Sequence, residues 1–199
     1  MTEKAASQGS GQGPGRGPGN MRLPGWSHAA GLIDLCPGAS GGDALARQLV
    51  VERVARYCWA YDERRADLLA DCFTKDAVWE GNVLDAIPIG PFRTRTGIID
   101  WLTGFWPHQH DQRRHMLLNN IVEQLDDDSA LTLSYLLLMA SDGRSSSIEC
   151  TGFYRCEHVR EGGTWRIARM TAGFDAPFWP GALEEMSVRG RRRHGVLSD

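Results

Sequence analysis

Between residues 44 and 61, apolar side chains recur every three or four positions, which is the spacing of one face of a helix. Asp43 precedes this stretch and is a residue type that commonly caps a first helical turn. The pattern predicts a helix over residues 44–61, whose inward-facing row ends at Asp62, an unusual position for a carboxylate. The apolar positions of that face are Val50, Val51, Val54, Ala55, Tyr57, Cys58 and Tyr61.

Two shorter helical stretches follow, over residues 66–73 and 96–106, with a strand predicted at 77–80 between them. From residue 113 the period of the apolar positions changes to two, which is typical of half-buried strands. Strands are predicted at 113–122, 130–139, 147–159 and 164–174. Helices followed by a long meander predict an α+β fold, in which the helices pack on one face of a curved antiparallel sheet.

Glycines and basic residues divide the chain into three parts. The first 42 residues hold 11 of the 23 glycines, so they cannot bury enough apolar surface to offset the entropy of ordering the backbone. We expect a flexible Gly/Pro-rich arm over residues 1–42, a folded domain over 43–180 and a basic tail over 181–199. Apolar side chains between residues 21 and 36 would allow that part of the arm to dock on the domain or on a neighbouring subunit.

Composition and charge narrow the class of protein. The 22 Lys and Arg against 25 Asp and Glu give a net charge of −3, which argues against a nucleic-acid-binding protein. No apolar run approaches the roughly 20 residues of a membrane-spanning helix. The N-terminal residues have no apolar core of the signal-peptide kind, and the five cysteines have no C-x-x-C spacing. We therefore expect a cytoplasmic protein with reduced thiols, which acts on a small molecule and binds neither a nucleic acid nor a membrane.

Motifs of cofactor and nucleophile chemistry are missing from the sequence. It contains no Walker A sequence, no dinucleotide-binding glycine pattern after a strand and no nucleophile elbow, because its one G-x-S-x-G spacing, at residues 38–42, lies in the Gly-rich arm with no predicted strand before it. His108 and His110, together with His115, have the spacing of some metal ligands, but no second ligand run accompanies them. We expect neither a metal nor an organic cofactor, and the histidine set is the alternative.

Asp62 and His115 are the most informative pair. If the inward face of the helix and one face of the strand from residue 113 share a core, these two side chains meet. A buried carboxylate needs a partner, and a histidine that it holds becomes a general base near neutral pH. Two plainer alternatives remain: a hydrogen-bonded core histidine, and an Asp62 paired with Arg64 or Arg65. The strand face of the histidine comprises His115, Leu117, Asn119 and Ile121, and Val122 belongs to the other face.

At these residues the sequence resembles the SnoaL-like (polyketide cyclase-like) branch of the nuclear transport factor 2-like superfamily, over residues 43–178. The resemblance implies a cone-shaped α+β fold, with a curved sheet wrapped on N-terminal helices around an apolar cavity. It also implies a homo-oligomer, dimer or trimer, formed through the open face of the sheet. The stretches that carry it are Tyr57–Asp62 with Ala66–Trp79, then Arg114–Val122, and the hairpin Gly152–Arg155 with Gly163–Ile167.

Within this superfamily the sequence is similar to scytalone dehydratase and hexachlorocyclohexane dehydrochlorinase, which are cofactor-free lyases with a His–Asp dyad. The resemblance assigns the dyad to His115 and Asp62, with Tyr57 or Tyr61 donating a proton to a leaving hydroxyl or an oxyanion. Tyr57 stands where the dehydrochlorinase has a lysine, which is a departure from halide-leaving chemistry. A hydrophobic cyclic substrate is implied, and the candidate cavity residues are Trp59, Trp79, Trp101, Phe105, Asn119, Phe153 and Arg155.

The first expectation is therefore a dehydratase-type lyase. An isomerase, or a cyclase of polyketide or steroid type, would use the same dyad, because elimination and isomerisation both begin with proton removal. A non-catalytic ligand-binding module, or the small subunit of a ring-hydroxylating dioxygenase, would share the fold and leave catalysis to a metal-bearing partner.

Overall fold

The structure is a computed structural model that describes residues 24–36 and 42–176. Its helices are α1 (Trp26–Ala29), α2 (Ala44–Asp62), α3 (Ala66–Asp71), α4 (Arg95–Thr103) and the 3₁₀ helix η1 (Trp106–His108). Its strands are β1 (Phe73–Val83), β2 (Ile87–Arg93), β3 (Gln112–Leu125), β4 (Ser129–Ser141), β5 (Ser146–Glu161) and β6 (Thr164–Phe174). Residues 1–23 and 37–41 of the flexible arm expected over 1–42, and the basic tail expected over 181–199, lie outside the described residues.

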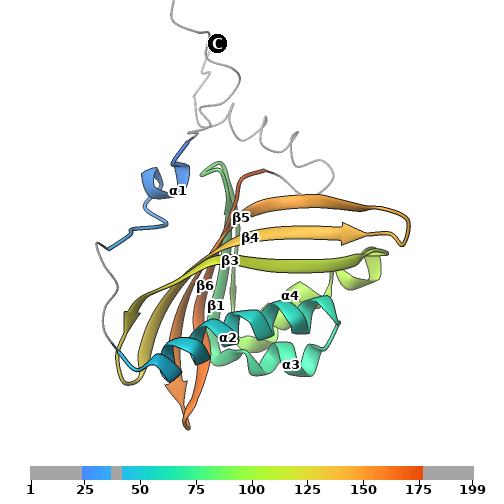
Figure 1. Cartoon of the computed structure of the whole chain (residues 1–199). Helices are drawn as coiled ribbons and strands as arrows, with labels where there is room; N and C mark the ends of the chain where they lie inside the picture. Colours follow the sequence, from blue (N-terminus) through green and yellow to red (C-terminus); the bar gives the residue numbers. More distant parts are fainter. Residues whose placement is uncertain (1–23, 37–41, 177–199) are drawn as a thin grey trace, which may run out of the picture.

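The six strands form one curved sheet in the order β2–β1–β6–β5–β4–β3. Neighbouring strands are antiparallel, except that β1 runs parallel to β6. Helices α2, α3 and α4 lie together on one side of the sheet, and α1 lies on the other side (Figure 1). The α+β architecture expected from the sequence is confirmed.

Strand β2 is the element that the hydrophobic pattern does not predict. Pro88, Gly90 and Pro91 interrupt this stretch, and a proline cannot donate a ladder hydrogen bond. The strand forms because it is the outermost strand of the sheet, where one edge needs no partner. The pairing of β1 with β2 and β6 also extends β1 well beyond the four residues predicted for it.

Helix α2 packs its apolar face on the sheet as its spacing predicts. Asp43 caps the helix, because its carboxylate accepts hydrogen bonds from the backbone N–H groups of Leu45 and Ala46.

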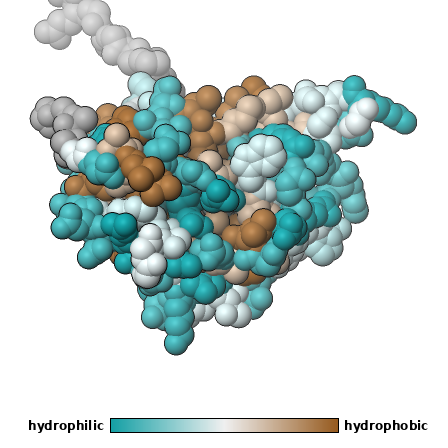
Figure 2. Space-filling model, turned by 60° about the horizontal axis from the view of Figure 1, so that its bottom comes forward, coloured by the Kyte–Doolittle hydropathy of each residue, from teal (hydrophilic) through white to brown (hydrophobic). Residues whose placement is uncertain are grey.

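The surface on the α2 side of the molecule is mainly hydrophilic (Figure 2). None of the described helices is long and apolar enough to cross a membrane. The buried residues of α2 are Val50, Val54, Tyr57, Cys58, Ala60 and Tyr61.

A bulge in β3 changes which side chains face the helices. Asn119 has a φ of 50°, in the left-handed region, and the pairing of β3 with β4 shifts between Leu118 and Ile121. Val122 is consequently buried and Ile121 is 40% exposed, the reverse of what strict alternation predicts. Because a bulge interrupts the alternation, the prediction that His115 and Asn119 share one continuous face is wrong.

Residues 24–36 cross the side of the sheet opposite α2. Trp26 is buried, and its indole N–H donates a hydrogen bond to Asp175 Oδ1 at 2.8 Å. The Trp26 ring packs on Phe153, with the two ring centroids 5.7 Å apart. This part of the N-terminal segment therefore docks on the domain itself, one of the two positions that the sequence allowed.

Candidate active site

Asp62 and His115 are in direct contact inside the molecule. Asp62 is the last residue of α2, and His115 lies near the start of β3. The Nδ1 atom of His115 is 2.5 Å from Asp62 Oδ1, and the backbone N–H of His115 donates to Asp62 Oδ2 at 2.8 Å. The side chain of His115 is only 10% exposed and that of Asp62 only 5%. One carboxylate thus holds both the ring and the backbone of the histidine.

This contact decides which ring nitrogen of His115 is free to react. An ionised carboxylate only accepts hydrogen bonds, so Nδ1 carries the proton that it donates to Asp62. In the neutral ring, Nε2 then keeps its lone pair. Nε2 makes no hydrogen bond within the described residues, and it is therefore available as a proton acceptor. The carboxylate would stabilise the imidazolium that forms.

Tyr61 covers one side of the histidine ring. The two rings meet edge to face, with centroids 5.2 Å apart, and Trp106 packs on the other side of Tyr61 at 5.9 Å. The Tyr61 hydroxyl accepts a hydrogen bond from Gln109 Nε2 at 2.9 Å. Burial raises the pKa of Tyr61, although the hydrogen bond with Gln109 acts in the opposite direction. Tyr61 therefore keeps its phenolic proton at neutral pH and can donate it.

The loop between α4 and β3 closes over this end of α2. Arg64 donates a hydrogen bond to the backbone carbonyl of Gln109, and Gln112 Nε2 donates to the carbonyl of Asp62 at 3.2 Å. These contacts hold the loop beside the dyad. The sequence pattern gave no sign of a role for Gln109 or Gln112 other than their position between Pro107 and the predicted strand that carries His115.

Tyr57 lies one helical turn before Tyr61 and is buried more deeply. Its ring packs edge to face on Phe73 and on Tyr154, with centroids 5.7 and 6.0 Å apart. Burial raises the pKa of Tyr57 well above its ordinary value, and the nearby indole N–H of Trp79 lowers it by a smaller amount. That N–H makes no hydrogen bond of standard geometry. Tyr57 is therefore a neutral phenol in an apolar setting.

Three of the predicted cavity residues form an aromatic cluster on the helical side of the sheet. The rings of Trp79 and Trp101 are 4.4 Å apart, and Trp101 stacks on Phe92 at 4.0 Å and meets Phe105 at 5.4 Å. The indole N–H groups of Trp79 and Trp106 are buried and have no hydrogen-bond partner in the described part of the chain. The cluster thus combines an apolar wall with one unused donor, and Trp106 carries a second unused donor beside Tyr61.

Four other predicted cavity residues lie away from the dyad. Phe153 and Arg155 alternate along β5 with residues that face the helices, so they project from the side of the sheet opposite His115. Asn119 lies in the bulge of β3, and Trp59 is 65% exposed on α2. Their placement corrects the expectation that they line one cavity with His115. The alternation of apolar and polar residues located Asn119, Phe153 and Arg155 on strands, but it could not decide which face of the sheet each side chain occupies.

The other candidate groups of the sequence lie outside this constellation. His108 and His110 are exposed in the loop before β3, and in the described ranges no three His, Cys, Asp or Glu side chains come together as metal ligands. Burial raises the pKa of both Cys150 and Cys156 to about 12. These two thiols are therefore protonated at neutral pH and are poor nucleophiles.

The family model described as a SnoaL-like domain matches residues 43–171. These residues include the dyad, the loop that closes over it and the aromatic cluster. No curated protein matches the sequence.

Solved structures are similar to this chain in fold. An NTF2-like protein with a cystatin-like fold from Novosphingobium aromaticivorans is 19% identical, with a TM-score of 0.56 over 71% of this chain and 88% of that one. ActVI-ORFA from Streptomyces coelicolor is 21% identical, with a TM-score of 0.55 over 64% and 96%. The beta subunit of a proposed aromatic-ring-hydroxylating dioxygenase from N. aromaticivorans is 15% identical, with a TM-score of 0.58 over 67% and 91%. The nuclear transport factor 2-like fold expected from the sequence is confirmed.

Proposed function

The chain belongs to the SnoaL-like domain family, and we propose that it is a cofactor-independent lyase that removes water from a hydrophobic cyclic molecule. The observation that carries the proposal is the contact between Asp62 and His115, at 2.5 Å and almost fully buried. A purely structural domain has little need for a buried ionisable pair, and such pairs concentrate at functional sites.

The chemical step follows from the orientation of the dyad. Nε2 of His115 takes a proton from a carbon next to the one that bears the leaving hydroxyl. The electron pair of the broken C–H bond forms the C=C bond, while the C–O bond breaks. The hydroxyl leaves as water with a proton from Tyr61, and the imidazolium returns its proton to the phenolate. Asp62 stabilises the imidazolium throughout this sequence.

The surroundings of the dyad support an apolar substrate with one polar oxygen. The cluster of Trp79, Trp101 and Phe105 supplies flat aromatic surface. The ring of Trp106 packs on Tyr61, and its indole N–H is buried without a hydrogen-bond partner among the described residues. A fixed donor of this kind stabilises an oxyanion that develops on a substrate carbonyl. We therefore assign to the site a cyclic hydroxy ketone or a similar molecule with an activated C–H bond.

Isomerisation or cyclisation is the second candidate reaction. The dyad contains one base, and once protonated this base can return a proton to another carbon of the bound substrate. The mass of the product distinguishes the reactions, because elimination removes water and isomerisation leaves the mass unchanged.

A non-catalytic role remains the third candidate. The likeness to a dioxygenase beta subunit, at 15% identity, concerns the fold alone. Copurification of an iron–sulfur partner would favour this role. Turnover by the isolated chain that depends on His115 would exclude it.

We also propose that the protein is a cytoplasmic homo-oligomer that uses the side of the sheet opposite α2. Large apolar residues of β3, β4 and β5 are exposed on the sheet, with exposed fractions of 47% for Leu118, 57% for Tyr135 and 62% for Ile148. Exposed apolar side chains grouped in this way are typical of an association surface. Five free cysteines are consistent with a reducing compartment.

Exchange of a carbon-bound proton tests the proposed base without knowledge of the final product. The purified chain is incubated in D₂O with a panel of cyclic β-hydroxy ketones, and deuterium incorporation and water loss are followed by NMR and mass spectrometry. We expect exchange or elimination that His115→Gln abolishes and that the exposed control His110→Gln retains. Equal activity in folded His115→Gln and in the unsubstituted protein would overturn the proposal.

A further inference from the structure

A half-open cavity lies on the side of the sheet opposite the dyad. It has a volume of about 490 Å³ and lies between residues 27–35 and the outer side of strands β3, β4 and β5. Figure 1 shows α1 and the segment after it apart from the helices that pack beside His115. A cavity of this size is in the range of small-molecule sites. Neither Asp62 nor His115 lines it.

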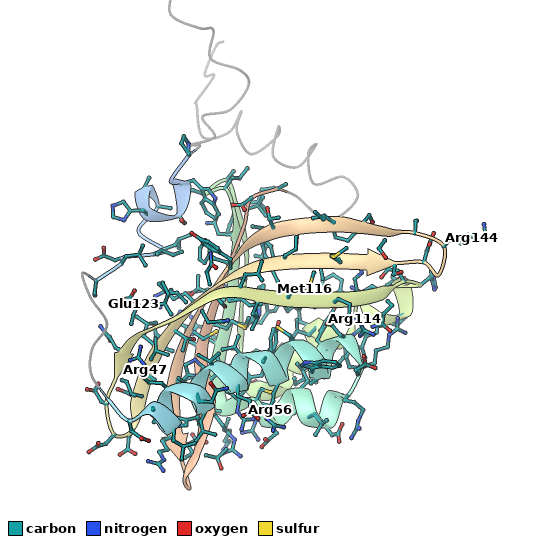
Figure 3. All side chains as sticks on the ribbon, in the orientation of Figure 1. Arg47, Arg56, Arg114, Met116, Glu123 and Arg144 are labelled. Carbon is teal, nitrogen blue, oxygen red and sulfur yellow. The ribbon has the colours of Figure 1, made fainter. Side chains whose placement is uncertain are left out.

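The segment over the cavity is fastened at both ends. At one end, the buried Trp26 packs on Phe153 and donates a hydrogen bond to Asp175. At the other end, the backbone N–H of Cys36 donates to Glu123 Oε2 at 3.2 Å, and this carboxylate is buried on β3. Figure 3 labels Glu123 at that end of the sheet. The cover therefore has two defined anchors and is not a loosely held arm.

The floor of the cavity is shaped by two local features of the sheet. Phe153 lies flat across Gly173, where a Cβ atom would come within 2.0 Å of the phenylalanine ring. Asn119, in the left-handed region, forms part of the wall where β3 bulges. Strained backbone of this kind is often found at functional sites. Leu133 and Tyr135 complete an apolar and aromatic floor.

The charge at the cavity is negative. Asp34 is the carboxylate that lines it, and neither lysine nor arginine does; His28, which also lines it, has Nδ1 3.3 Å from the carbonyl of Ile33. Among the described residues Asp34 and Glu123 form no salt bridge, and both raise the pKa of the neighbouring Cys36 thiol. Arg155 lies opposite the cavity residue Leu133 in the pairing of β4 with β5, and it forms a salt bridge with Glu157 at 2.5 Å. A cation that enters the cavity would meet a carboxylate that forms no salt bridge among the described residues, and the aromatic side chains of Tyr135 and Phe153.

We propose that this cavity binds a small organic cation, an amine with an aromatic or otherwise apolar body. The apolar body would lie on Leu133, Phe153 and Tyr135, and the ammonium group would face Asp34. The assignment is independent of the proposed lyase activity, because it uses the other side of the sheet and a different set of side chains.

The test compares three probes of matched shape against the full chain by isothermal titration calorimetry. These are 2-naphthylmethylamine, which is cationic at neutral pH, the neutral 2-naphthylmethanol, and the anionic 2-naphthoate. We expect the amine to bind about tenfold more tightly than the alcohol, and the carboxylate to bind least, because of charge complementarity. Binding of the amine no tighter than that of the other two probes would overturn the proposal.

Substitutions locate the binding to this cavity. Asp34→Asn should reduce the affinity for the amine about tenfold to that of the alcohol, while the control Asp127→Asn, in an exposed turn, should leave it unchanged. Leu133→Trp fills the space above the cavity floor and should weaken the binding of both the amine and the alcohol. If that variant fails to fold, the exposed Asp34 still decides the question, since an unchanged amine affinity in Asp34→Asn contradicts the assignment. His115→Gln should bind the amine normally, which separates this site from the proposed active site.

Discussion

The Asp62 carboxylate holds His115 at two points, the ring nitrogen Nδ1 and the backbone N–H of the same residue. The first contact sets the tautomer of the ring, and the second ties the end of α2 to the start of β3. One side chain therefore joins the two elements and orients the proposed base. The proposed chemistry and the local structure depend on the same carboxylate.

Asp62→Asn should lower kcat/KM by about two to four orders of magnitude, because the amide no longer enforces the reactive tautomer or stabilises the imidazolium. Steady-state kinetics with the substrate found by the exchange screen measure the effect. Asp67→Asn is the matched control, since Asp67 pairs with Arg65 at the exposed surface. Retention of full activity in Asp62→Asn would exclude the dyad from catalysis.

Tyr61→Phe should reduce kcat about tenfold to a hundredfold, with little change in the thermal midpoint, because it removes the acidic proton but keeps the ring between His115 and Trp106. Tyr57→Phe is the companion variant, since its hydroxyl lies one helical turn away. A larger loss in Tyr57→Phe than in Tyr61→Phe would transfer the role of proton donor to Tyr57.

Gly173→Ala should destabilise the protein by about 1–3 kcal/mol, because the added Cβ meets the ring of Phe153 and overpacks the sheet. Urea unfolding measures the change. The double variant with Phe153→Leu should recover part of the loss, since the smaller side chain leaves room for the methyl group. Additive effects in the double variant would show that the two positions do not press on one another.

His158 should make the fold sensitive to acid. It is buried, with Nε2 2.9 Å from Thr132 Oγ1, and burial, followed by the charge of Arg53, lowers its pKa from 6.5 to about 3. Below pH 6.5 the unfolded chain binds a proton that the folded chain does not, so stability falls as the pH falls from 6.5 towards 3. The slope approaches about 1.4 kcal/mol per pH unit.

His158→Gln provides the comparison for this pH dependence. The variant loses stability at every pH, but its free energy of unfolding should change less steeply between pH 6.5 and the onset of acid unfolding. Urea titrations at a series of pH values measure both slopes. Parallel slopes would mean that other groups cause the acid sensitivity.

The exposed residues of the sheet should determine the oligomeric state. Tyr135→Lys and Ile148→Lys each place a charge in the apolar surface and should shift the protein towards the monomer in sedimentation velocity. Leu68→Lys, at an apolar residue of α3 that is 49% exposed, is the control and should leave the assembly intact. A monomeric unsubstituted protein would contradict the proposed assembly directly.

Much of the fold could be predicted from local patterns. The three-four spacing before Asp62 located α2 and its buried face, because a helix exposes one face to the core at that period. Alternation located the long strands for the corresponding reason. β2 was not predicted because its prolines argue against a strand, and such a strand forms only at the edge of a sheet, where one side needs no hydrogen-bond partner.

The candidate site was predictable only in part. The inward position of Asp62 is a local property of a helix, so the sequence alone indicated a carboxylate that needs a partner. Gln109 escaped, since a loop residue carries no periodic signal and acquires its role when the loop folds back on α2. Trp106 was placed in the helix predicted over 96–106, and its contact with Tyr61 appears only in the folded chain. Phe153 was assigned to the wrong cavity because alternation identifies two faces of a strand but not which of them packs on the helices.

By itself, then, the sequence determined the class of fold, the principal helix and the inward position of Asp62, all of which depend on short-range spacing and residue chemistry. The tertiary structure decided which side of the sheet each strand residue faces, the shift at Asn119 and the anchoring of residues 24–36. These depend on pairing between segments that are far apart along the chain, and no local pattern specifies the register at which such segments meet.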